Sequence, residues 1–143
     1  MQALLFLAKQ PSRQPVLISE MAEKARLPRK FLESILLELR NVGVLQSKKG
    51  KGGGYSLSRD PERIFLGSVV RLLNGPLAPV ACASQTAYSR CEDCVSEETC
   101  GVHIIMKDVR DAMANILDKT SLADLRARVG QASEIEGSLV LLK

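Results

Sequence analysis

The stretch PRKFLESILLELRNVGVLQSKKGKGGGYSL, residues 28–57, decides the fold that we expect for this chain. Its first half has the apolar spacing of an amphipathic helix, at positions i, i+3, i+4 and i+7. These apolar positions are Leu32, Ile35, Leu36 and Leu39. Pro28 suits the first position of a helix, and Gly43 suits the position just beyond its end. We therefore predict a helix from Pro28 to about Asn41.

A second, shorter helix precedes this one. Ser19 is a candidate N-cap and Glu20 stands in the first turn, where a carboxylate is favourable. We expect this helix to end near Ala25, followed by a tight turn at residues 26–27. Two short helices joined by about three residues, the second one amphipathic, are typical of a helix-turn-helix DNA-binding motif.

The second half of the quoted stretch predicts a β-hairpin. Residues 44–48 and 55–58 alternate in polarity like strands, and the glycine-rich segment 49–54 lies between them. Lysines and glycines are common at any exposed hairpin tip, so composition alone does not make this a binding element. Directly after a helix-turn-helix, however, a hairpin bearing Lys48, Lys49 and Lys51 is expected to contact DNA as a wing.

Composition and charge limit the class of protein. The chain has 143 residues, 45% of them hydrophobic, with no tryptophan, and no run of about 18 apolar residues that would span a membrane. Through Asp60 there are eleven Lys or Arg against five Asp or Glu, a net charge of +6, whereas the remainder carries −2. A basic front half suits a nucleic-acid-binding module, although ordinary surface charge would look similar. The start has no basic leader, so we expect a cytoplasmic protein in a reducing compartment.

Further helices flank this module. A short helix is expected at residues 2–9, closed by prolines. Because this helix is so short, the natural N-terminus is expected further upstream. Another helix is expected at 66–74 and ends at Asn74-Gly75-Pro76. From Gly101 to Lys119 a longer helix carries a coiled-coil-like seam, which favours a homodimer over the core helix of a monomer. The seam residues are Val102, Ile105, Val109, Ala112 and Ile116, and Met106 and Met113 widen its apolar face. Ser121 and Asp124 are expected to cap a last short helix through Val129, and the apolar tail Leu139–Leu142 either docks or frays.

All four cysteines and the single histidine fall within residues 82–103, as Cys82, Cys91, Cys94, Cys100 and His103. Thiolates favour iron–sulfur clusters, zinc or copper(I), so this segment is a candidate metal or redox centre. Zinc is a weaker alternative, because only five residues separate the Cys-x-x-Cys and Cys-x-x-His pairs. A metal-free thiol switch and a small iron–sulfur electron-transfer protein also stay open. No nucleophile–base pair or phosphate loop is present, so an enzyme is not expected.

The order of these elements resembles the Rrf-two-type bacterial transcription regulators, the family of IscR and NsrR. The resemblance covers nearly the whole chain, and its most specific parts outside the cysteines are Phe31-Leu32-Glu33 and the wing Lys49–Leu57 with Tyr55. It implies a mainly α fold with a small β-hairpin wing. The corresponding domains are a winged helix-turn-helix at 1–78, a cysteine-rich cluster-binding loop at 79–103, and a dimerisation helix with its tail at 104–143.

The resemblance also implies a homodimer that binds double-stranded promoter DNA and carries a cluster on its cysteine loop. Cys94, Cys100 and His103 match the end of the IscR-like ligand pattern. The first ligand does not match. Relatives place it further before the middle ligand than Cys91 lies before Cys94, but not as far before it as Cys82 lies. In some relatives the remaining ligand comes from the partner subunit. In this chain a fourth cysteine would take its place, which favours an all-cysteine 4Fe–4S cluster, with 2Fe–2S as the alternative.

Specific DNA contacts are expected from the N-terminal end of the helix that begins at Pro28. Arg29 and Lys30 suit guanine, and Glu33 suits the cytosine amino group, although Glu33 could equally be solvated or paired with a neighbouring cation. The wing lysines and Tyr55 are expected to contact phosphate or the minor groove, which adds affinity and salt dependence more than specificity.

Overall fold

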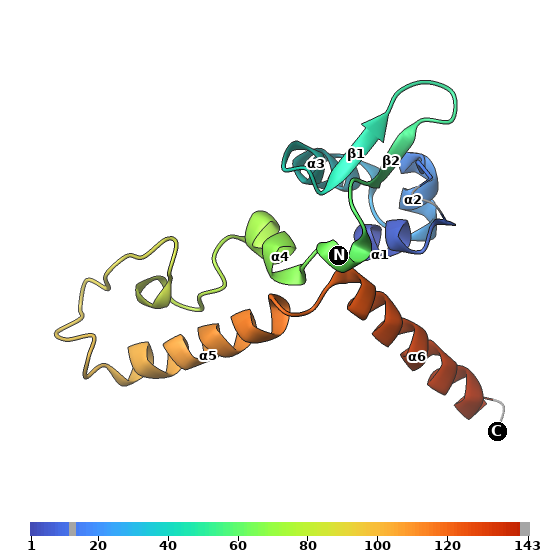
Figure 1. Ribbon diagram of the computed structural model, residues 1–143. Helices are drawn as coiled ribbons and strands as arrows, with labels where there is room; N and C mark the ends of the chain where they lie inside the picture. The colour runs from blue at the N-terminus through green and yellow to red at the C-terminus, as the bar shows by residue number, and fades with distance from the viewer. Residues whose placement is uncertain (12–13, 141–143) are drawn as a thin grey trace. The chain divides into compact units, whose positions relative to one another are not determined.

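The computed structural model describes residues 1–11 and 14–140, with side chains up to residue 133 (Figure 1). Tertiary contacts divide the chain into two units, one formed by residues 1–64 with those from Ser121 onward, the other by Phe65–Thr120. The fold is mainly helical, with one two-stranded antiparallel sheet, as the sequence predicts. No helix in the described ranges is both long and apolar enough to cross a membrane.

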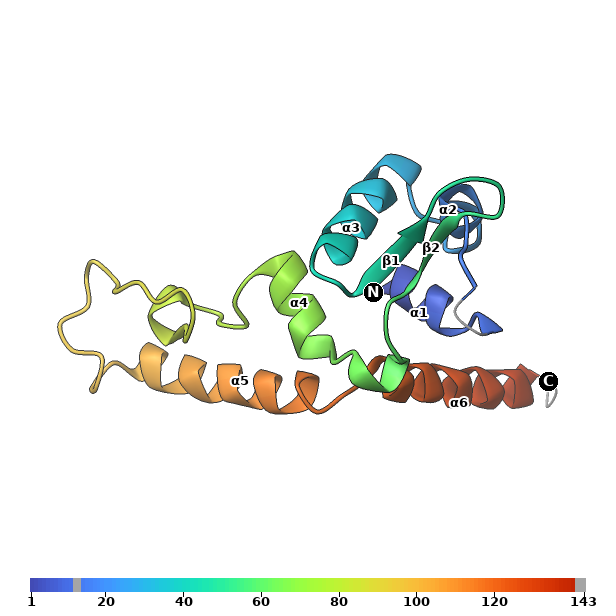
Figure 2. The same cartoon turned by 45° about the horizontal axis from the view of Figure 1, so that its top comes forward.

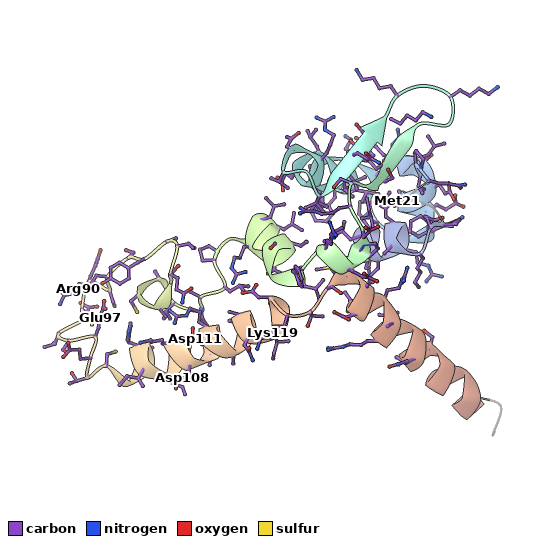
Figure 3. All side chains as sticks on the ribbon, in the orientation of Figure 1. Met21, Arg90, Glu97, Asp108, Asp111 and Lys119 are labelled. Carbon is purple, nitrogen blue, oxygen red and sulfur yellow. The ribbon has the colours of Figure 1, made fainter. Side chains whose placement is uncertain are left out.

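The first unit contains the predicted helix-turn-helix. Its elements are α1 (Gln2–Ala8), α2 (Ile18–Lys24), α3 (Arg29–Asn41), β1 (Leu45–Lys48), β2 (Gly54–Leu57), a 3-10 turn (Pro61–Arg63) and α6 (Leu122–Val140). Met21, labelled in Figure 3, is fully buried between these elements. Leu32, Leu36 and Leu39 give α3 its buried stripe, and Ile35 is half-buried beside them. The helical spacing read from the sequence is therefore confirmed.

Both ends of α3 follow local backbone chemistry. Pro28 occupies the N-cap, one position earlier than predicted, and Arg26 in the preceding turn has a positive φ of 51°. At the other end, Gly43 has φ 73°, its N–H bonds the Arg40 carbonyl, and the Val44 N–H bonds the Leu39 carbonyl. This is the Schellman arrangement that favours glycine, so the predicted stop is confirmed.

The prediction that Ser19 caps α2 is wrong. The helix begins at Ile18, with Leu17 at the N-cap and no side-chain cap. The reason lies in the hairpin: Val16 and Tyr55 exchange two backbone hydrogen bonds of 2.9 Å, which hold the chain extended up to Leu17. Ser19 therefore falls inside the first turn.

The wing is a regular antiparallel pair beside α3 (Figure 2). Leu45 pairs with Leu57 and Lys48 with Gly54, so the three lysines stand at the end of β1 and in the turn. Gly54 has φ 140°, and a Cβ there would collide with the Val16 carbonyl. Glycine is therefore required where the wing meets the segment before α2.

The second unit contains α4 (Leu66–Asn74), a 3-10 turn (Ala81–Ala83) and the long α5 (Gly101–Leu117). Gly75, with φ 82°, ends α4 as predicted. The Arg71 guanidinium binds both carboxylate oxygens of Asp118, at 2.6 and 2.9 Å, which ties α4 to the end of α5. Arg110 of α5 donates to the Ala83 carbonyl at 2.6 Å and so fastens the turn that carries Cys82.

The last helix is longer than predicted. Ser121 and Asp124 form the expected reciprocal cap, but α6 continues to Val140 instead of ending near Val129. Gly130 costs only about 1 kcal/mol inside a helix, and no proline follows it, so the glycine does not terminate α6. Leu141 and Leu142 of the predicted tail lie outside the described residues.

Asp124→Asn tests this cap through its pH dependence. The carboxylate accepts hydrogen bonds from the Ser121 hydroxyl and N–H, and these bonds lower the pKa of Asp124. A lowered folded-state pKa contributes stability above the unfolded value of about 3.9, and that stability is lost as the pH falls through the folded value. We expect the variant to be less stable at pH 7 and the gap to narrow near pH 3, in denaturant titrations. An equal gap at both pH values would contradict the assignment.

Candidate DNA interface and candidate metal centre

A groove of about 370 Å³ lies in the first unit between α3, the start of α2 and the wing. Four of the predicted DNA-binding residues line it, namely Arg29, Lys48, Lys49 and Tyr55. The remaining three lie elsewhere: Lys30 is exposed in the first turn of α3, Lys51 is exposed at the wing tip, and Glu33 is one turn further along α3. No carboxylate is among the lining residues, so the groove presents positive charge only.

Glu33 is engaged by its own helix. Its carboxylate accepts a hydrogen bond from the Arg29 Nε at 3.0 Å, in an i, i+4 ion pair. Both side chains are largely exposed, at 66% and 44%, and exposed pairs of this kind are weak. The pair can therefore open, and each partner is free to exchange the other for a base edge. Base contacts by Arg29 and Glu33 stay predictions.

The sequence reading missed Arg40, which also lines the groove. It lies eleven residues after Arg29, which is close to three helical turns, so both guanidinium groups project from the same side of α3. That spacing was a usable signal. Ser19 and Ser47 line the groove as well and supply hydroxyl groups of the kind that bind phosphate.

Replacing Lys48 and Lys49 together by alanine tests the wing. We expect binding to weaken equally on all DNA sequences, and the slope of log affinity against log salt to flatten by about 2, since each phosphate contact contributes about 0.9. The matched control is Lys107→Ala with Lys119→Ala, which removes the same charge from exposed sites in the other unit. Equal slopes for the wing variant and the parent, by fluorescence anisotropy, would contradict a phosphate-binding wing.

A second pocket, of about 410 Å³, lies within the second unit and gathers the predicted metal ligands. It is lined by Cys82, Cys91, Cys94, Cys100 and His103, together with Arg90, Asp93 and a few apolar residues. Cys82 comes from the 3-10 turn, Cys91 and Cys94 come from the loop, and Cys100 is the N-cap of α5. All four thiols are free. Residues up to 21 positions apart in the sequence thus border one space.

Two observations indicate that this pocket suits a cation. His103 Nδ1 is buried and has no hydrogen-bond partner among the described residues, and a buried polar atom left unpaired is costly. Burial, followed by the charge of Cys100, raises the pKa of the Cys94 thiol, so a bare thiolate is disfavoured. A bound metal would supply the missing partner and the missing positive charge. Among the described residues no three His, Cys, Asp or Glu side chains are yet arranged to hold one metal ion.

The long helix α5 has two different faces. Its half-buried side carries His103, Met106, Arg110, Met113 and Leu117. The seam predicted from the sequence lies on a different side of α5, which is exposed in the single chain: Val102 is 58%, Ile105 52% and Ile116 60% exposed. The two methionines therefore belong to the half-buried side of the helix and do not widen the exposed seam.

A helix-turn-helix followed by a basic hairpin defines the class of winged-helix DNA-binding transcription regulators. Comparison with known proteins agrees: the Rrf2 family, described as an iron-dependent transcriptional regulator, matches residues 1–128. The chain belongs to the Rrf2 family. Since the family and its relatives are transcription regulators, the chain is a regulator and not an enzyme.

Individual relatives cover most of the chain. An rrf2-like HTH-type regulator from Rhodobacter capsulatus is 36% identical over 94% of this chain and 92% of its own length. The structure of CymR, the global cysteine regulator of B. subtilis, is 30% identical with a TM-score of 0.72, over 89% of each chain. The structure of T. potens IscR is 26% identical with a TM-score of 0.71, over 92% of this chain and 82% of IscR.

Proposed function

We propose that this regulator is a homodimer whose promoter binding is controlled by an iron–sulfur cluster in the cysteine pocket. The observation that carries the proposal is the pocket itself, bordered by four free thiols and by a buried imidazole nitrogen that has no hydrogen-bond partner in the part of the chain that the structure describes. Soft thiolate ligands suit iron–sulfur clusters, and the family is described as iron-dependent. The regulator would act in the cytoplasm, on double-stranded promoter DNA.

The residues that would hold the cluster are Cys82, Cys91, Cys94 and Cys100, with His103 as an alternative to one thiol. Four cysteines favour a 4Fe–4S cluster, and a set that includes His103 would suit 2Fe–2S. The cluster would supply a reversible change of charge and ligation. This chain's residues would convert that change into movement: Cys100 and His103 stand in the first turn of α5, and the turn holding Cys82 is fastened to Arg110 of the same helix.

Dimerisation is supported by the exposed face of α5. Val102, Ile105, Val109 and Ile116 recur at intervals of three, four and seven residues, and all are exposed in the single chain. Apolar faces of this kind mark interaction surfaces, and a heptad-like spacing fits a second copy of the same helix. A twofold dimer would present two α3 helices to a palindromic site.

A metal-free thiol switch is the second candidate, supported by the relatives named CymR, one of which is a cysteine regulator and another of which was solved in an oxidised form. The raised pKa of Cys94 works against it, because reactive thiols have lowered pKa values. A zinc site is the third candidate.

Anaerobic purification followed by an absorbance spectrum and metal analysis tests the proposal. We expect a broad visible band, with iron and sulfide in equal amounts. Zinc without sulfide would favour the zinc site, and a colourless, metal-free protein would favour the thiol switch. Either result would overturn the cluster.

A further inference from the structure

The cysteine loop is closed by a short side-chain hydrogen bond. The Tyr88 hydroxyl donates to the Glu97 carboxylate at 2.6 Å, and the segment between them, residues 89–96, includes Cys91 and Cys94. We propose that Tyr88 and Glu97 are a positioning pair that holds the four thiols around their pocket. The reason for gathering the thiols, to hold a cluster, rests on the proposed function. The gathering itself can be measured without any metal.

The backbone on either side of this bond connects it to the other two thiols. The Ser89 N–H, next to Tyr88, bonds the Ala81 carbonyl at 3.3 Å, which holds the loop beside Cys82. The Cys100 N–H bonds the Glu97 carbonyl at 3.4 Å, which holds the start of α5 beside the other end of the pair. Each partner of the side-chain bond is therefore linked, through one backbone hydrogen bond at or next to it, to the segment that carries Cys82 or Cys100.

Two contacts inside the loop hold its own cysteines. The Cys94 N–H bonds the Cys91 carbonyl at 3.2 Å and closes a turn between them. The Arg90 guanidinium donates to the Cys94 carbonyl at 3.1 Å, and Figure 3 shows Arg90 and Glu97 on the same stretch of the loop. If the Tyr88–Glu97 bond is removed, these local contacts survive, but the two ends of the loop lose their direct side-chain connection.

The expected strength of the pair follows from its chemistry. A hydroxyl bonded to a carboxylate is a charge-assisted hydrogen bond, stronger than a neutral one. Tyr88 is 55% exposed, so water competes for the bond and the effect is moderate. When either partner is removed, we expect the fraction of molecules whose thiols lie close together to fall about tenfold. This factor is within the range of one such hydrogen bond.

The test compares Tyr88→Phe, Glu97→Ala and Glu97→Gln with the parent chain. Phenylarsine oxide, which bridges two closely spaced thiols, is titrated into the reduced, metal-free proteins in a Cys91→Ser background, so that it cannot use the local Cys91–Cys94 pair and has to bridge thiols of different segments. Release of iron to a chelator is timed in the anaerobic, cluster-loaded proteins that keep all four cysteines. Tyr88→Phe and Glu97→Ala are expected to bind the arsenical about tenfold more weakly and to release iron about tenfold faster. Glu97→Gln keeps an acceptor oxygen but loses the charge, so it should fall between the parent and Glu97→Ala. The double variant Tyr88→Phe with Glu97→Ala should be no worse than either single variant.

The outcomes separate the two proposals. If the parent holds no iron but Tyr88→Phe and Glu97→Ala still weaken arsenical binding, the cluster is wrong and the positioning pair stands. If the parent holds its cluster and both variants match it in arsenical binding and in iron release, the positioning pair is wrong. Both residues are exposed or half-buried in a loop, so the variants should fold, which circular dichroism checks.

Discussion

Cys94→Ser and Cys100→Ser, each made alone, should remove the visible absorbance and most of the iron from anaerobically purified protein. Serine offers a hard oxygen that stays protonated near neutral pH, where cysteine offers a soft thiolate. Both thiols border the pocket, and burial, followed by the charge of Cys100, raises the pKa of Cys94, so a positive centre beside Cys94 would favour its thiolate. We expect iron per chain to fall at least about tenfold, a loss no smaller than that from removing an outer-shell partner.

Ser96→Ala is the control for both cysteine variants. It changes a side chain in the same loop that does not line the pocket, and it should leave the iron content and the spectrum unchanged. Either cysteine variant retaining the parent's iron and spectrum would remove that thiol from the ligand set. If both retained them, the cluster would have to lie outside this pocket.

If the proposed dimer forms through the seam of α5, Ile105→Glu should convert it to monomers and weaken operator binding on the order of 100-fold. Ile105 is one of the exposed seam residues of α5, and burying an unpaired carboxylate in a dimer interface is strongly unfavourable. A monomer contacts only one half-site and loses the gain of linked binding, which typically amounts to two or more orders of magnitude. Light scattering gives the mass, and anisotropy on whole and half operators gives the affinity.

Asn115→Glu makes the same charge change on another side of α5, at a residue that is also exposed. It should leave both the mass and the affinity close to those of the parent. A dimeric Ile105→Glu variant with the parent's operator affinity would show that the seam is not the interface.

The sequence predicted those elements whose signals are local. The apolar stripe of α3, the Gly43 stop, the β-hairpin and the Ser121–Asp124 cap depend on neighbouring residues, and the structure confirms them. Gly54, predicted in the turn, is the first residue of β2. Ser19 was assigned wrongly because a contact between Val16 and Tyr55, 39 residues apart, determines where α2 begins. No pattern near Ser19 contains that information.

The same distinction, between local sequence signals and contacts between distant residues, applies to the candidate sites. Four groove residues were predicted from their place in the wing and in α3. Arg40 lies three helical turns after Arg29, near the other end of α3, and only this helical spacing would have pointed to it. The five ligand candidates were predicted from their residue types, their clustering within residues 82–103 and the resemblance to the family. Three features depend on the path of an irregular loop, which has no periodicity to read. They are the shared pocket, the buried His103 Nδ1 and the bond from Tyr88 to Glu97.

The cluster proposed for the cysteine pocket is expected to set the affinity for the promoter. This is tested by the operator affinity of one anaerobic preparation, measured before and after its iron is removed by a chelator, at a single salt concentration. We expect the two dissociation constants to differ by about tenfold or more, the range typical of coupled sites. Equal constants, with Cys94→Ser protein also unchanged, would contradict it.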